Sequence, residues 1–147
     1  MTLSVGYKQL RKGRNSCIGF TYHITFTTHN RQPVFSDLYT ARLLISIMHS
    51  DGISSKCDTL SFVIMPDHIH WLLELKEGEV SSLIQRVKSL FTKKHGRCIW
   101  QNGFYDHGIR SDEALIDVAR YIVANPLRAG LVKNIKDYPY WDSSWLN

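Results

Sequence analysis

Two histidines one residue apart, His68 and His70, are the first side chains in this sequence that could do chemistry. They lie in segment 62–75, where two apolar, partly β-branched runs flank Pro66-Asp67, a pattern that predicts a strand, a tight connection and a second strand. Side chains alternate along a strand, so both imidazoles point to one face and, when neutral, could share a divalent ion. Because a His-x-His motif is short, the alternative is a pair of half-exposed strand histidines without a chemical role.

A tyrosine and an asparagine, Tyr121 and Asn125, are four residues apart in a stretch with helical periodicity. Residues at this spacing are neighbours on a helix surface, so the phenol and the carboxamide project together. Two neutral imidazoles and an amide oxygen can hold a divalent ion that polarises a phosphate for attack by the tyrosine. Tyrosine is a weak nucleophile at its ordinary pKa of about 10, so it would need activation by the ion or by a local base. Taken alone, Tyr121 could instead be an amphipathic aromatic at the edge of the core, as most helix tyrosines are.

Positive charge suggests a polyanionic partner. The chain has 18 Lys and Arg against 13 Asp and Glu, a formal net charge of +5. Arg86, Lys93 and Arg97 fall at i, i+7 and i+11 of a predicted helix, which places three positive charges on one side of it. This side of the helix is either a groove for phosphates or a solvated face. Residues 1–16 form a basic N-terminal arm, which is either solvated or lies on a nucleic-acid backbone.

Composition indicates one soluble domain over residues 1–147. Hydrophobic residues make up 44% and charged residues 21%, which is ordinary for a globular protein. No run is long enough to span a bilayer and the N-terminus lacks the apolar core of a signal peptide, so we expect a cytoplasmic protein. Cys17, Cys57 and Cys98 are widely spaced and odd in number, which predicts reduced structural thiols.

The elements that must position these side chains follow from periodicity. Strands are predicted at 20–28, 57–65, 68–75 and 104–109, the middle two as a hairpin. Helices are predicted from Ser36 or Asp37 to about Asp51-Gly52, from Ser81 or Ser82 onward, and, with Ser111 as N-cap, from Asp112 to about Asn125, with a short turn ending at Gly130.

This order, β-α-β-β-α-β-α, predicts an α+β fold with a four-stranded, mainly antiparallel sheet covered by helices, related to the ferredoxin-like arrangement. The histidine pair would then lie on a central strand. The aromatic C-terminal tail, 133–147, is expected to pack back on the body; base stacking on its rings is the alternative.

Several segments together resemble a known family. Met-Pro-Asp-His-Ile-His-Trp-Leu-Leu at 65–73 resembles the His-hydrophobic-His signature of HUH single-strand endonucleases, in the form carried by Y1 tyrosine transposases. Segments 22–26, 31–35, 100–110 and 119–132 continue the match in order, over roughly residues 20–145. The Asn-Pro-x-Arg-Ala-Gly run at 125–130 looks like the branch of REP-associated tyrosine transposases, which are related to the IS200/IS605 transposases.

The resemblance implies an HUH fold and an enzyme that cleaves and rejoins single-stranded or hairpin DNA. His68 and His70 would bind magnesium or manganese, with Asn125 as third ligand, where the insertion-sequence branch typically has glutamine. Tyr121 matches the nucleophile, which would form a 5′-phosphotyrosine link and release a 3′-hydroxyl. Relatives include monomers and dimers, so the oligomeric state stays open.

Other assignments leave alternatives. His107 lies on a strand that could neighbour the histidine strand and support a metal ligand, or it is only a strand-end histidine. Arg110 and Arg128 flank the tyrosine helix and could contact phosphates or pair with Asp112 or Asp117. Two other functions are a DNA-binding protein that holds palindromic repeats without cutting them, and a small metal-dependent hydrolase in which the tyrosine is structural.

Overall fold

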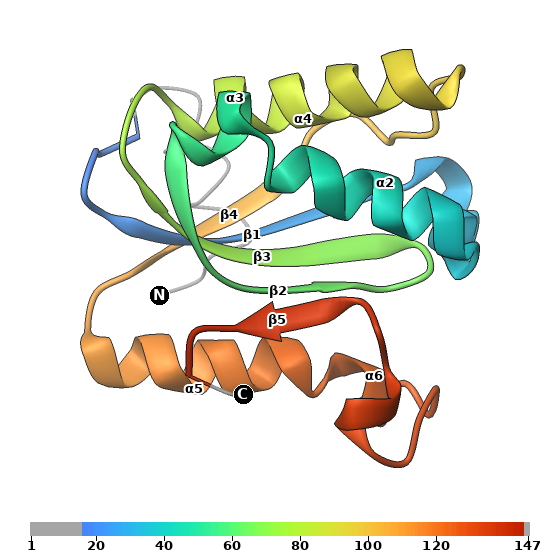
Figure 1. The fold of residues 1–147 in the computed structure, drawn as a ribbon. Coiled ribbons are helices and arrows are strands. Elements are labelled where there is room, and N and C mark those ends of the chain that lie inside the picture. Colours follow the sequence, from blue (N-terminus) through green and yellow to red (C-terminus); the bar gives the residue numbers. More distant parts are fainter. Residues whose placement is uncertain (1–15, 146–147) are drawn as a thin grey trace.

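A single antiparallel sheet is the centre of the computed structural model, which describes residues 16–145 (Figure 1). Within that range five strands lie in the order β4-β1-β3-β2-β5, and each neighbouring pair is antiparallel. The α+β class, the hairpin and the central position of the histidine strand are confirmed. The strands are β1 (Thr21–Thr27), β2 (Cys57–Ile64), β3 (His68–Leu75), β4 (Tyr105–Ile109) and β5 (Trp141–Ser143).

Helices cover both faces of the sheet. Figure 1 shows α2, α3 and α4 on one face and α5 and α6 on the other. The helices are α2 (Leu38–Met48), α3 (Asp51–Ser54), α4 (Val80–His95), α5 (Asp112–Val123) and α6 (Asn125–Arg128), with 3-10 turns η1 (His29–Arg31), η2 (Val34–Ser36) and η3 (Ile135–Asp137). No helix within residues 16–145 is long and apolar enough to cross a membrane.

Helix ends agree with the sequence prediction where the cap is local. Asp37 caps α2 by accepting a hydrogen bond from the Thr40 N–H at 2.9 Å, and Ser111 caps α5 in the same way. The predicted end of the first helix near residues 51–52 is wrong, because α2 stops at Met48 and residues 51–54 form the separate helix α3.

The predicted start of α4 at Ser81 or Ser82 is also wrong. The helix begins at Val80, whose N–H donates a hydrogen bond to the hydroxyl of Ser16 at 3.0 Å. The residue that satisfies this helix terminus is 64 positions away in the sequence. A tertiary contact therefore satisfies the first N–H of α4.

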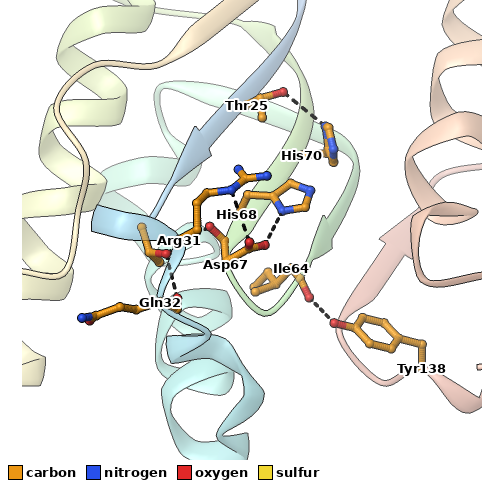
Figure 2. A network of polar contacts seen from close by, with 9 residues as sticks. Thr25, Arg31, Gln32, Ile64, Asp67, His68, His70 and Tyr138 are labelled. Atoms are coloured by element: carbon orange, nitrogen blue, oxygen red, sulfur yellow. Dashed lines mark hydrogen bonds and ion pairs between the residues drawn. The ribbon is translucent and has the colours of Figure 1, made fainter. Parts of the chain in front are cut away.

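The C-terminal tail packs back on the body, as expected, and adds a strand that the sequence did not predict. β5 pairs with the outer edge of β2, so the sheet has five strands rather than four. Tyr138 is 8% exposed and its hydroxyl donates a hydrogen bond to the Ile64 carbonyl at 2.6 Å (Figure 2). Trp141 donates from its indole nitrogen to the Ile135 carbonyl at 3.0 Å.

The alternation of β3 divides its side chains between two cores. Ile69, Trp71 and Leu73 pack with α2 and α4 in the larger core. Leu72 packs with residues of α5, including Ala119 and Ile122, in the smaller core on the other face. His68 and His70 have the same parity as Leu72, so both imidazoles face the α5 side of the sheet.

Replacing Tyr138 with phenylalanine should lower the free energy of unfolding by about 1 kcal/mol, the usual contribution of one such hydrogen bond. The substitution removes the hydroxyl that binds the tail to the end of β2. Urea unfolding monitored by circular dichroism measures the change. Tyr39→Phe is the control, since Tyr39 is 80% exposed and should change stability by less than about 0.5 kcal/mol. Equal stability of the two variants would contradict the prediction.

Candidate active site

His68 and His70 lie side by side on β3, with ring centroids 5.0 Å apart and planes at 84°. His68 Nδ1 is 2.7 Å from Asp67 Oδ1, and Asp67 Oδ2 is 3.3 Å from Arg31 Nε (Figure 2). A carboxylate can only accept here, so Nδ1 of His68 carries the proton in this bond. When the ring is neutral, its Nε2 then has a free lone pair that suits a metal ion.

His70 is held by two groups of β1. Its Nδ1 lies 2.9 Å from His23 Nε2 and 3.2 Å from Thr25 Oγ1, and Thr25 is directly opposite His70 in the strand register. Figure 2 shows the Thr25 contact. Sequence reasoning did not identify His23 as a site residue. Alternation along the strand predicts on which face of the sheet the His23 side chain lies. Its contact with His70, however, depends on the register of β1 against β3.

Both imidazoles of this contact are neutral at pH 7. Burial, with a smaller effect from His107, lowers the pKa of His23 to about 4. Burial also lowers the pKa of His70 to about 3, helped by the neighbouring His23, His68 and Arg128. A neutral imidazole is the form that binds a metal ion.

The metal-free protein should lose stability as pH falls from 7 to 5. His23 and His70 have folded pKa values of about 4 and about 3, below the unfolded value of 6.5, so the unfolded state binds more protons in this window. Each of the two histidines should lower the free energy of unfolding by about 2 kcal/mol at pH 5 relative to pH 7. Urea unfolding in EDTA at both pH values measures the loss. A double variant, His23→Gln with His70→Gln, should remove most of it, and an unchanged pH dependence would contradict the assignment.

Tyr121 reaches the histidine pair within one chain. Its ring centroid is 6.4 Å from that of His70, with the planes at 86°, and the side chain is 53% exposed. α5 packs on β2, β3 and β5 through Ala119 and Ile122, which leaves the phenol at the margin of the helix contact. The predicted nucleophile is therefore accessible beside the predicted metal ligands.

Asn125 and Arg128 both bind the backbone at the end of the tyrosine helix. Asn125 Nδ2 donates to the Ile122 carbonyl at 3.0 Å and to the Tyr121 carbonyl at 3.3 Å. This orientation leaves the amide oxygen as the group that could bind a cation. Arg128 donates to the Tyr121 carbonyl at 2.8 Å, and its guanidinium carbon lies 3.9 Å from the centroid of the Tyr121 ring. Arg128 therefore stacks on the predicted nucleophile.

The structure does not bring the predicted basic face to this site. Arg86 and Lys93 are exposed on α4, which lies on the face of the sheet opposite the histidine pair (Figure 1). Arg97 is not on the helix, because α4 ends at His95 and Gly96 has a φ of 101°. Arg110 is exposed in the connection between β4 and α5. As DNA contacts, these four side chains stay predictions.

His107 is one strand further from the metal site than the sequence suggested. β4 pairs with β1 and not with β3, so His107 is directly opposite His23 in the register. It could support a metal ligand only through His23.

The predicted arm at residues 1–16 lies almost wholly outside the described residues. Cys17, Cys57 and Cys98 are free thiols, but only Cys57 is buried, so a structural role is supported for Cys57 alone.

The donor set fits a divalent cation with few protein ligands. Among residues 16–145, no group of three or more His, Cys, Asp and Glu side chains is arranged to hold a metal ion. A third protein ligand would then be neutral, and the Asn125 carboxamide oxygen has the required chemistry. Imidazole and amide donors with open positions leave room for phosphate oxygens.

Comparison with known proteins gives consistent results. A family model described as "Transposase IS200 like" matches residues 16–125, which include both histidines and the tyrosine. A REP-associated tyrosine transposase of Escherichia coli K12 is 35% identical over 83 residues, 54% of this chain and 50% of that protein. A Haemophilus influenzae protein with the same name, given provisionally, is 34% identical over 100 residues, 56% of this chain and 57% of that protein.

A solved structure extends the likeness to the fold. A REP-associated tyrosine transposase bound to a REP hairpin has a TM-score of 0.73 at 26% identity, and the match covers 87% of this chain and 79% of that one. The chain spans about half the length of the curated relatives it matches.

Proposed function

Because this chain belongs to the IS200-like transposase family, we propose that it cleaves and rejoins single-stranded DNA through a covalent bond to Tyr121. One observation carries the proposal: the Tyr121 ring lies 6.4 Å from His70 within the same chain. Without that proximity the histidine pair and the tyrosine would be separate features. Since the site needs no residue from a second copy, the geometry favours a subunit that acts alone.

His68, His70 and Asn125 would hold a magnesium or manganese ion, the two histidines through Nε2 and the asparagine through its amide oxygen. When bound, such an ion polarises the phosphate and stabilises the negative charge that develops on it. The neutral state of His70, maintained by burial, keeps its lone pair available near pH 7.

The reaction of Tyr121 is an exchange of phosphate esters. The phenol oxygen attacks the phosphorus, the bond from phosphorus to the 3′ oxygen breaks, and a 5′-phosphotyrosine forms. The phenol proton ends on the departing oxygen, which becomes a 3′-hydroxyl. Attack by another 3′-hydroxyl reverses the step and rejoins strands, so no nucleotide hydrolysis is required. Arg128, stacked on the phenol, would place a positive charge beside the incoming phosphate.

The DNA is proposed to contain a hairpin with an adjoining single strand. Support comes from the solved relative with TM-score 0.73, which is bound to a REP hairpin. The excess of Lys and Arg over Asp and Glu, 18 against 13, favours such a partner.

Incubation with magnesium and a panel of labelled hairpin oligonucleotides tests the function. A denaturing gel should show a labelled band at the mass of protein plus DNA, together with a shorter product ending in a 3′-hydroxyl. Cleaved DNA without attached protein would indicate a hydrolase instead. DNA binding without cleavage in magnesium or manganese, across the panel, would indicate a protein that only holds hairpins.

A further inference from the structure

We propose that His23 is a positioning residue for metal binding: it accepts the Nδ1 proton of His70 and thereby turns the lone pair of His70 Nε2 toward the cation. The proposal rests on the metal site of the proposed function. It assigns a role to a residue of β1 that neither binds the ion nor touches Tyr121 in the described contacts.

The contact between the two imidazoles leaves two possible positions for one shared proton. His23 Nε2 and His70 Nδ1 are 2.9 Å apart, so one proton must lie between these two nitrogens. If that proton were on His23, a neutral His70 would carry its own proton on Nε2 and could not bind a metal there. Metal binding through Nε2 therefore requires that His70 donates and His23 accepts.

Thr25 is compatible with the same assignment. Its Oγ1 lies 3.2 Å from His70 Nδ1, and a hydroxyl oxygen can accept a share of the same N–H. His23 and Thr25 are two residues apart on β1, so strand alternation presents both to one imidazole edge. The Nδ1 edge of His70 thus faces two groups of one strand that can both accept its proton.

His68 and His70 would then differ in how strongly each binds the metal ion. His68 donates to the Asp67 carboxylate at 2.7 Å, and Asp67 also contacts Arg31. A charged acceptor makes the imidazole a stronger ligand than the neutral ring of His23 does. His70 would be the weaker ligand of the pair, and its orientation would depend more on its hydrogen-bonding partner.

Two variants at residue 23 separate a positioning role from packing. His23→Ala removes the acceptor and should weaken Mn²⁺ binding by about 10-fold to 100-fold, the usual effect of losing such a partner. His23→Gln keeps an acceptor oxygen and should recover most of the affinity. Calorimetry with Mn²⁺ alone gives the affinities, without DNA. His49→Ala is the control, because His49 contacts Phe62 and the Ile45 carbonyl on the other side of the sheet.

The proton position can also be read directly in the wild-type protein without metal. Long-range ¹H–¹⁵N correlation spectra should show His70 protonated at Nδ1, and in His23→Ala this preference should weaken while His68 stays unchanged. A wild-type His70 protonated at Nε2 would overturn the proposal, as would His23→Ala with wild-type Mn²⁺ affinity or wild-type protein that binds no Mn²⁺. Failure of the proposed function would appear separately, as metal binding without any covalent DNA adduct.

Discussion

Tyr121→Phe should abolish the covalent DNA adduct while leaving the fold and DNA binding intact. The substitution removes only the phenol oxygen, the atom proposed to attack phosphorus, and no other group in the described site could form the same ester. We expect cleavage to fall by at least about a thousand-fold, the order seen when a nucleophile is deleted. Because Tyr121 is 53% exposed, stability should change by less than about 0.5 kcal/mol.

The measurement is the yield of protein–DNA band on a denaturing gel, with binding followed in parallel by fluorescence anisotropy. Tyr39→Phe is a matched control, since Tyr39 is a helix tyrosine that is 80% exposed on α2, away from the histidine pair. Its adduct yield should equal that of the wild type. An adduct that persists in Tyr121→Phe would remove Tyr121 from the mechanism.

His70→Ala should abolish the stabilisation of the protein by Mn²⁺. A ligand present at 100 times its dissociation constant adds about 2.7 kcal/mol to the free energy of unfolding. Loss of a residue that only supports a metal ligand weakens metal binding by roughly 10-fold to 100-fold. Removal of one of the two imidazole ligands should weaken Mn²⁺ binding by more than that. The stabilisation by Mn²⁺ should therefore disappear. Covalent adduct formation should disappear with it.

Urea unfolding of each protein in Mn²⁺ and again in EDTA measures the stabilisation by the metal. The two free energies of unfolding are compared within the same protein. This comparison cancels the loss of packing that the smaller side chain causes in metal-free protein. His49→Ala is the control, because His49 contacts Phe62 and the Ile45 carbonyl on the other side of the sheet. It should keep the Mn²⁺ increment. An unchanged increment in His70→Ala would place the cation elsewhere.

The sequence predicted the parts of this molecule that depend on local patterns. Alternation in segments 20–28 and 68–75 was enough to place two central strands and to put both histidines on one face. The caps Asp37 and Ser111 were recognisable because each acts on its own helix. The distance of Tyr121 from the histidines could not come from periodicity. The prediction of a shared site came from the chemistry that these residue types could perform together and from the resemblance.

Long-range pairing set the limits of the prediction. The cap from Ser16, the register that brings His23 to His70, and the strand β5 all depend on residues more than 40 positions apart. Local sequence propensity contains no information about such long-range contacts. A three-residue strand also has too few positions for alternation to be detected.

The misplaced basic face has a topological reason. β1 and β2 lie on either side of β3 and both pair antiparallel with it, so they run parallel to each other, and the same holds for β3 and β4 on either side of β1. Right-handed crossovers between these parallel strands put α2 and α4 on the same face. The large apolar side chains Ile69, Trp71 and Leu73 meet those helices. The histidines therefore had to face away from α4.

β5 protects one margin of the sheet. Residues 140–144 bind the backbone of β2 from Leu60 to Ile64, and so occupy hydrogen-bonding groups that would otherwise be open along that strand. A chain shortened before residue 140 would present this row of amides and carbonyls, next to buried Phe62 and Val63, to any other extended polypeptide. We therefore expect the aromatic tail to limit self-association by strand pairing, a role separate from the chemistry proposed at β3 and α5.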